Sequence, residues 1–290
     1  MGEKIGPFQV LGTLGKGAHS TILHVRRSAD GRQYALKVVP INGPADSKFL
    51  EQAEHEYRVA CKLDHPNLIK VYALEKQRSL FFRVREVRLL IEYVNGRTLD
   101  TFGVLLVPML VQIFVQVASG LVHMHRRNIC HADLKPNNIM LSRTGEVKVL
   151  DYGLAWIKGE DKGRIQGTPE YMAPEQVKTR VANERTDIFN FGATMYRLCT
   201  FRHIPQVIAD SGGLPLPAKA WAAQLKPVRE LNPNIPPELA DIIHRCLAYN
   251  PHERPERMSE IQGALDHLAD QLVKSPDDRL EALEWQEDTR

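Results

Sequence analysis

The residues most able to do chemistry lie together between His131 and Asn138, where the chain has the sequence His-Ala-Asp-Leu-Lys-Pro-Asn-Asn. This stretch places an acid (Asp133), a base (Lys135) and an amide (Asn138) within six residues. Pro136 and the two asparagines disfavour a regular helix, so we expect a loop of fixed shape, anchored by the apolar residues on either side. Polar groups on an anchored loop are a common form of active site, although a plain surface turn has a similar composition.

A second acidic group is Asp151, in the sequence Asp-Tyr-Gly. It directly follows an apolar strand predicted at 147–150, which itself follows a Thr-Gly turn. A strand, a turn and a second strand would return Asp151 towards the first loop. The oxygens of Asp151 and Asn138 suit Mg²⁺, which usually takes one or two carboxylates together with phosphates. Taken singly, each of these residues is more commonly a turn former.

A third stretch is Gly-Lys-Gly at 15–17, between strands predicted at 8–14 and 21–26. Glycines permit backbone N–H groups to approach phosphates closely, but many hairpins contain such a turn. Lys37 adds a cation on the next predicted strand, 34–39, where it shares a face with Ala35 because side chains alternate. The pattern therefore indicates a phosphate site only in combination with other groups.

A helix is predicted at 47–63, because apolar residues recur there at spacings of three, four and seven. Glu56 falls on the same stripe, and a carboxylate on a buried face needs a cation or hydrogen-bond donors. Lys37 is the natural partner. The alternative is that Glu56 lies at the edge of the helix and reaches water. The stripe itself consists of Phe49, Ala53, Ala60 and Leu63.

The chain divides near residue 95 into a strand-rich part and a helix-rich part. Two further strands are predicted at 68–74 and 87–94, joined by a basic link of undetermined form at 75–86. After the Asn-Gly pair the apolar pattern becomes helical, and the proline-rich stretch 201–237 predicts loops and short helices. The longer helices are predicted at 107–126, 187–199, 237–247 and 259–273.

Composition bounds the function classes. With 290 residues, of which 43% are hydrophobic and 25% charged, the chain is large enough for one large domain or two lobes. A net charge of +3 is too balanced to indicate binding to nucleic acid or to a membrane surface. The apolar run 102–122 is long enough to span a membrane, but Pro108 and recurring polar residues predict a helix buried in a lobe. Four dispersed cysteines predict buried thiols in a reducing compartment, and we expect a cytoplasmic location.

The motifs resemble those of the eukaryotic-type protein kinases, and particularly of their bacterial members, from about residue 8 to about residue 272. The resemblance implies an α+β fold of two lobes, namely an antiparallel sheet with one helix (about 1–94) and a mostly helical lobe (about 95–275), followed by an acidic tail (276–290). It rests on Gly15-x-Gly17, Ala35-Leu36-Lys37, Glu56, His131-Ala-Asp133-Leu-Lys135-Pro-x-Asn138, Asp151-Tyr-Gly153, Gly167-Thr168-Pro-Glu-Tyr-Met, Ala173-Pro174-Glu175, Asp187-x-x-x-Phe191-Gly192 and Arg254.

The resemblance implies transfer of the γ-phosphate of ATP to protein hydroxyls, with Mg²⁺ or Mn²⁺ as the metal. Asp133 would orient the substrate hydroxyl and accept its proton, and Lys135 would steady the transferring group. Asn138 and Asp151 would bind the metal. Lys135 and Thr168 resemble serine/threonine rather than tyrosine kinases. The residues implied to hold the nucleotide are Leu14, Gly15, Lys16, Gly17, Ala18, His19, Ser20, Thr21, Ile22, Ala35, Lys37, Glu56, Glu92, Val94 and Met140.

Two implied contacts are structural: Glu175 would pair with Arg254, and Asp187 would brace the catalytic loop. The chain also departs from the family pattern at Ser20 (for glycine), Tyr152 (for Phe) and Ala132. Many kinases have an arginine at the last position, where it binds a phosphate on the activation loop. Because 154–167 contains no Ser, Thr or Tyr, we expect activity that does not depend on phosphorylation of that segment.

Two alternatives remain. A binding module of kinase shape would usually have lost the Lys, the Asp or a metal ligand, and none is lost here. A small-molecule kinase shares a related loop, but it usually lacks the Ala-Pro-Glu segment and its arginine partner. The protein substrate stays open, as does control by homodimer formation or by the tail. We expect no nucleic acid as a partner and no membrane segment in this chain.

Overall fold

The computed structural model describes residues 3–17, 19–79, 83–160, 167–178, 182–208 and 216–272. They form two compact units. The N-terminal unit contains the described residues up to 64, together with 69–95 and 151–153. The C-terminal unit contains 65–68, 96–150 and the described residues from 154 on. The predicted acidic tail at 276–290 lies outside the described residues.

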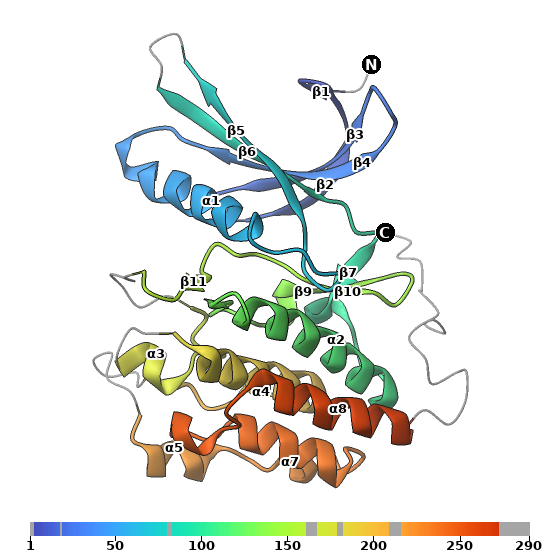
Figure 1. Cartoon of the computed structure of the whole chain (residues 1–290), viewed down its shortest axis with the longest axis vertical. Helices are drawn as coiled ribbons and strands as arrows, with labels where there is room; N and C mark the ends of the chain where they lie inside the picture. The colour runs from blue at the N-terminus through green and yellow to red at the C-terminus, as the bar shows by residue number, and fades with distance from the viewer. Residues whose placement is uncertain are drawn as a thin grey trace. The chain divides into compact units, whose positions relative to one another are not determined.

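The N-terminal unit is built on an antiparallel sheet of six strands in the order β1-β2-β3-β4-β6-β5 (Figure 1). The three strands predicted first are confirmed, with ends that extend by one or two residues. The described residues of the undetermined link 75–86 extend β5 to Arg78 and start β6 at Val84, and these antiparallel strands place Glu75 opposite Arg88. The strands are β1 (Lys4–Ile5), β2 (Phe8–Lys16), β3 (Thr21–Arg27), β4 (Gln33–Pro40), β5 (Val71–Arg78) and β6 (Val84–Glu92).

The strand predicted at 68–74 begins later, at Val71, because Leu68 instead forms a parallel bridge with Val149 in the C-terminal unit. The predicted strand 87–94 likewise ends at Glu92. In both cases cross-strand pairing, rather than local composition, decides where the strand begins or ends.

Helix α1 (Ser47–Ala60) lies along one face of this sheet (Figure 1). Its apolar stripe enters the core against the strands, while a separate apolar cluster fills the other face of the sheet. The helix ends three residues before the predicted end, since Lys62 and Leu63 form turn bonds to Val59 and Ala60. The core under the helix consists of Val39, Ala53, Val87 and Leu89.

The C-terminal unit is mostly helical, as predicted. Its helices are α2 (Val107–His125), α3 (Pro174–Lys178), α4 (Glu184–Thr200), α5 (Ala218–Gln224), α6 (Val228–Leu231), α7 (Pro237–Cys246) and α8 (Met258–Leu272). Short strands and 3₁₀ turns connect them, namely β7 (Gly96–Thr98), β8 (Ile129–Cys130), β9 (Ile139–Ser142), β10 (Val147–Val149), β11 (Trp156–Ile157), η2 (Leu99–Thr101), η3 (Pro136–Asn138) and η4 (Pro251–Glu253).

Helix α4 differs from its prediction, whereas α2 agrees with it. Helix α4 begins three residues before the predicted start, because Asn183 accepts hydrogen bonds from two backbone N–H groups and forms a capping box with Thr186. Helix α2 is the apolar run. Among the described residues it alone is long and apolar enough to cross a membrane by length and composition, and 56% of its apolar window is buried. It packs against α8, as predicted for a buried helix.

The prediction of four buried cysteines was wrong for Cys61, which is exposed. The residue is the C-cap of α1 and directly follows Ala60, the last buried residue of the helix. Cys130, Cys199 and Cys246 are buried, and none of the four cysteines, all of which lie within the described residues, is in a disulfide.

Candidate active site

The catalytic-loop candidate runs from the end of β8 to the start of β9 and contains η3. Asp133 is 7% exposed. Its backbone N–H donates to His131 Nδ1 (3.3 Å), while His131 Nε2 lies 2.9 Å from the carbonyl oxygen of Leu150. Both bonds form in the tautomer that carries its proton on Nε2, because Nε2–H then donates to Leu150 and the bare Nδ1 accepts from Asp133. The amide of Asn138 donates to the Asp133 carbonyl (2.9 Å), and these bonds give the loop its predicted fixed shape.

Thr168 and Lys135 both donate hydrogen bonds to the Asp133 carboxylate. Oδ1 accepts from the backbone N–H of Thr168 (2.9 Å) and from its hydroxyl (2.8 Å). Lys135 Nζ donates to Asp133 Oδ2 (2.9 Å) and to Thr168 Oγ1 (2.7 Å). The carboxylate therefore already accepts a hydrogen bond from a hydroxyl with an ammonium group beside it. The sequence placed Asp133 and Lys135 together, but it gave no sign that Thr168 would reach them.

Asp187 braces this loop, as the resemblance implied. The carboxylate is fully buried at the start of α4 and accepts from the backbone N–H groups of His131 and Ala132, each at 2.8 Å. Ala132 has a φ of 62°, in the left-handed region that costs an L-residue energy, and its carbonyl accepts from Gln176 Nε2 (2.9 Å). Strong bonds on both sides hold this unfavourable backbone in place.

His125 was missed by the sequence analysis. At the end of α2, its Nε2 lies 2.8 Å from Asp187 Oδ2 and its Nδ1 lies 3.1 Å from Glu184 Oε1. Burial lowers the pKa of His125, but the hydrogen bond to Asp187 and the nearby carboxylate of Glu184 outweigh it and raise the pKa to about 9. The only available signal was a titratable residue at the end of an apolar helix, and this does not identify its partners.

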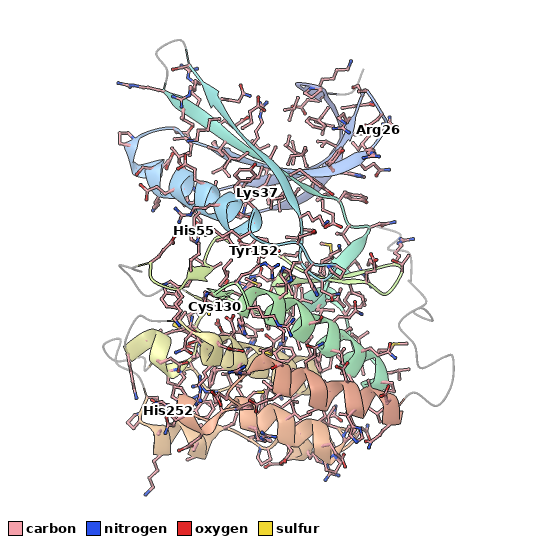
Figure 2. All side chains as sticks on the ribbon, viewed as in Figure 1. Arg26, Lys37, His55, Cys130, Tyr152 and His252 are labelled. Atoms are coloured by element: carbon pink, nitrogen blue, oxygen red, sulfur yellow. The ribbon has the colours of Figure 1, made fainter. Side chains whose placement is uncertain are left out.

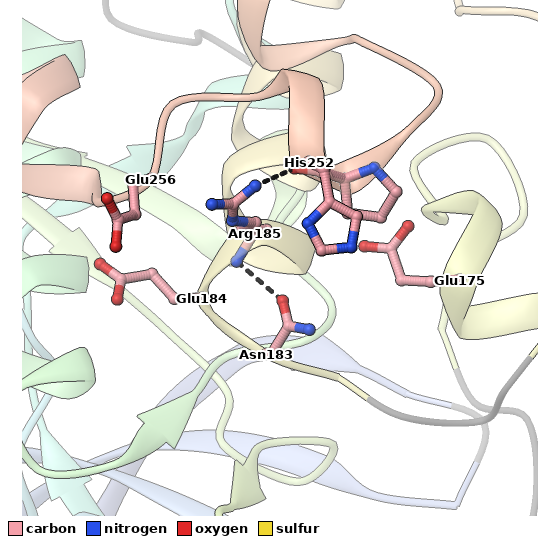
Figure 3. A pocket seen from close by; sticks show the side chains of 7 residues that line it. Glu175, Asn183, Glu184, Arg185, His252 and Glu256 are labelled. Carbon is pink, nitrogen blue, oxygen red and sulfur yellow. Dashed lines mark hydrogen bonds between the residues drawn. The ribbon is translucent and has the colours of Figure 1, made fainter.

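The predicted pair of Glu175 and Arg254 forms as a bidentate ion pair, with N–O distances of 2.7 and 3.0 Å. The guanidinium is buried and also donates to three backbone carbonyls. Glu175 also lines a pocket with Arg185, which donates to the carbonyl of Pro251 (Figure 3). The pair thus fixes the Ala-Pro-Glu segment to the start of α4 and to the η4 turn.

In the N-terminal unit, the predicted pair of Lys37 and Glu56 also forms, with Nζ and Oε2 2.7 Å apart. The carboxylate of Glu56 is buried, and Lys37 (labelled in Figure 2) extends from β4. Burial lowers the pKa of Lys37, but the nearby carboxylates of Glu56 and Asp151 raise it, so the cation is retained. Lys37, Glu56 and Asp151 line one cavity of about 220 Å³.

The glycine-rich turn is tighter than predicted. Strand β2 includes Gly15, which pairs with Ile22, and the N–H of Gly17 donates to the Ser20 carbonyl (2.8 Å). A Cβ on Gly17 would lie 2.9 Å from Ser20 Oγ. Ser20, which stands where the family usually has glycine, therefore fills the space beside Gly17. Ala18 lies outside the described residues.

Asp151 has a φ of 62°, and its Oδ1 accepts from the N–H of Gly153 (3.0 Å). The hydroxyl of Tyr152 (labelled in Figure 2), which replaces the usual Phe, donates to the carbonyl of Ile69 (2.9 Å). Burial raises the pKa of this phenol well above its ordinary value, so it stays a neutral donor. The extra hydroxyl is therefore accommodated within the N-terminal unit.

The remaining predicted residues lie on regular elements. Ala35 is on β4 opposite Ile91, and Met140 is on β9 opposite Thr98. The Glu92 carboxylate accepts from the Lys70 N–H (3.1 Å) at the end of β6. All described residues predicted to bind nucleotide, apart from Met140, therefore belong to the N-terminal unit. Asp151, a predicted metal ligand, belongs to the same unit. The C-terminal unit holds Asp133, Lys135, Asn138 and Met140.

Comparisons with known proteins agree with these motifs. The chain is 27% identical over 272 residues to Serine/threonine-protein kinase PrkC of Bacillus subtilis, covering 91% of this chain and 41% of PrkC. It is 28% identical to Probable serine/threonine-protein kinase SCO3848 of Streptomyces coelicolor, covering 91% and 40% of the two chains. It is also 28% identical to Tyrosine-protein kinase MasK of Myxococcus xanthus, covering 91% and 43%. The chain spans about two-fifths of the length of these relatives. Residues 8–268 match the protein kinase domain, and the chain belongs to that family.

Proposed function

We propose that this chain is a serine/threonine protein kinase that transfers the γ-phosphate of ATP to protein hydroxyls. The observation that carries this proposal is the Asp133 carboxylate, which accepts the Thr168 hydroxyl at 2.8 Å while Lys135 lies beside both groups. A carboxylate in this setting can orient a substrate hydroxyl and accept its proton as the new bond to phosphorus forms. Lys135 would neutralise charge that develops on the transferring group.

In the N-terminal unit, the paired Lys37 would bind two phosphates, and backbone N–H groups of the glycine-rich turn would cover them. Phosphate binding by Lys37 is supported by its surroundings, because the carboxylates of Glu56 and Asp151 raise its pKa and keep it charged inside the cavity. The backbone of Glu92 and Val94 would hydrogen-bond the base, with Ala35 and Met140 packing against it. These roles follow the resemblance residue by residue.

Asn138 and Asp151 would be the ligands of Mg²⁺, or of Mn²⁺ in its place. Bound Mg²⁺ supplies charge neutralisation between the phosphates. The donor set fits a hard cation, because Asp151 offers carboxylate oxygens and Asn138 an amide oxygen. The Asn138 nitrogen donates to the Asp133 carbonyl, so the amide oxygen is directed away from Asp133.

The experiment that tests the acceptor class is transfer from labelled ATP to a generic basic protein, followed by acid hydrolysis and separation of the phosphoamino acids. Phosphoserine and phosphothreonine are expected. Label on phosphotyrosine alone would contradict the serine/threonine assignment, and this outcome matters because one relative is named a tyrosine-protein kinase. Label on a metabolite but on no protein would favour the small-molecule alternative.

We also propose that activity does not depend on phosphorylation of the activation loop, including the adjoining Thr168. Ala132 cannot bind a phosphate through its side chain, and 154–167 contains no Ser, Thr or Tyr. The prediction is that protein freshly treated with a phosphatase, which is then removed, keeps its full initial rate. Mass spectrometry that found a required phosphate on Thr168 in the active protein would contradict it.

A further inference from the structure

The strongest feature of the N-terminal unit that has no assigned role is a ring contact between His19 and Phe49. The imidazole lies on the phenyl ring with centroids 3.8 Å apart and an angle of 28° between the planes. His19 belongs to the glycine-rich turn, whereas Phe49 belongs to the first turn of α1. Stacked aromatic rings attract each other beyond the effect of the area that they bury. The turn is therefore attached to a helix that is distant in sequence.

The same face of α1 makes two further attachments. Phe49 and Glu56 are seven residues apart, which is two turns, so both project from one side of the helix. Glu56 binds Lys37 of β4. Gln52 lies between them and packs against Gly153, where an added Cβ would come within 2.7 Å of Gln52 Nε2. One helix face therefore contacts the glycine-rich turn, the phosphate-binding lysine and the Asp-Tyr-Gly segment.

The stack also lines the cavity that holds the charged groups. His19 and Phe49 line the same cavity of about 220 Å³ as Lys37 and Asp151. On the outside, Lys48 Nζ lies 4.9 Å from the centroid of the Phe49 ring, a cation–π distance that favours the present position of the ring. A displacement of His19 would therefore move one wall of the cavity beside the proposed phosphate site.

We propose that His19 and Phe49 are positioning residues, which set the pose of the glycine-rich turn from helix α1. The turn and the Lys37–Glu56 pair then take their places together, because a single helix holds both. This inference rests on the proposed nucleotide binding. It adds a pair of residues that would act on the nucleotide through the backbone N–H groups of the turn. The chemical class of the ligand remains a nucleoside triphosphate with Mg²⁺.

The test is a double-mutant cycle on the affinity for Mg²⁺-ATP, with His19→Ala, Phe49→Ala and the double variant. Each single variant is expected to bind about 3- to 10-fold more weakly, and the double variant no more weakly than either. His19→Phe keeps a stacking ring and should restore the affinity. Glu51→Ala, an exposed position on the same turn of α1, is the matched control and should bind like the unaltered protein. Two single effects that multiply in the double variant would overturn the proposal.

A second measurement separates this inference from the proposed function. Hydrogen–deuterium exchange of peptides covering 13–23 is followed without nucleotide in the unaltered protein and in both single variants. Exchange several-fold faster in both variants, with unchanged exchange in β5 and β6, would support the attachment. Unchanged exchange at 13–23 would overturn it. If the unaltered protein bound no Mg²⁺-ATP, the proposed function would fail, while the exchange data would still decide whether the stack holds the turn.

Discussion

At the scale of single residues, the catalytic loop depends on a charge that is almost fully buried. The side chain of His125 is 4% exposed and lies between the carboxylates of Asp187 and Glu184. Asp187 in turn receives the backbone N–H groups of His131 and Ala132. An imidazolium at His125 neutralises the buried carboxylate that fixes the loop, so its protonation state contributes to the stability of the site.

This arrangement predicts how stability changes with pH. The pKa of His125 is about 9 in the folded protein against 6.5 for an ordinary histidine. Because the folded state retains the proton, the contribution is fully present below about pH 6.5 and is lost as the pH rises through about 9. On the order of 3 kcal/mol of unfolding free energy should disappear across this interval, and chemical denaturation at a series of pH values measures it.

His125→Gln is the control, since glutamine does not titrate. The difference in unfolding free energy between the two proteins should shrink steadily from pH 6.5 to 9. A constant difference over that interval would mean that the histidine does not gain a proton on folding.

At the scale of elements, helix α4 organises the C-terminal unit. Asp187 holds the catalytic loop, and one turn later Asn190 donates to the carbonyl of Tyr171 (2.6 Å). One further turn along, Thr194 Oγ1 donates to the carbonyl of Leu134 (3.3 Å). The catalytic loop and the segment around Tyr171, which are far apart in sequence, are therefore both held by helix α4. Figure 1 shows α4 beside α2 and α8 within this unit.

Two glycines in helices of this unit predict effects of opposite sign. A Cβ on Gly192 of α4 would lie 2.7 Å from Cys246 Cβ, whereas a Cβ on Gly263 of α8 would meet nothing within 4 Å. Gly192→Ala should therefore lower the unfolding free energy by about 1–3 kcal/mol through overpacking. Gly263→Ala should raise it by up to about 1 kcal/mol, since alanine favours the helix. Effects of the same sign in urea unfolding would contradict the packing of α4 against α7.

The ion pair of Arg254 and Glu175 gives a larger prediction. Arg254→Ala leaves a largely buried carboxylate and three carbonyls without their partner, so unfolding should become easier by about 3–5 kcal/mol. Arg245→Ala, at an exposed position on α7, is the matched control and should change stability by at most about 0.5 kcal/mol. A loss of less than about 1 kcal/mol for Arg254→Ala would mean that the pair is solvated in the native protein.

Local patterns predicted most helices and strands, because their apolar periods are long and clear. The Lys37–Glu56 pair was also predictable, since each charge stands on an otherwise apolar element and needs a partner. The start of the strand predicted at 68–74 and the end of the one predicted at 87–94 were not predictable, because both depend on pairing with other strands. The partners of Thr168 and His125 lie 35 and 62 residues away in sequence, and no local pattern encodes such contacts. The Glu175–Arg254 pair, 79 residues apart, came from the family resemblance alone.

At the scale of the whole molecule, the two units carry different parts of the proposed chemistry. The groups proposed to bind phosphate lie in the N-terminal unit, and the proposed proton acceptor lies in the C-terminal unit. Lys37→Met and Asp133→Asn should therefore each remove phosphate transfer while the protein stays folded. The chain covers about two-fifths of the length of these relatives, so the acceptor protein belongs to the proposal and not to the comparison.

The most direct measurement is phosphate transfer from labelled ATP with Mg²⁺, to the protein itself and to a generic basic protein, with Asp133→Asn as the control. Labelling that disappears in Asp133→Asn, whose thermal unfolding is unchanged, is the expected result. Equal labelling in both proteins would contradict the role of Asp133. No labelling by the unaltered protein, with ATP still stabilising it against heat, would contradict catalysis by the chain alone and favour a nucleotide-binding module.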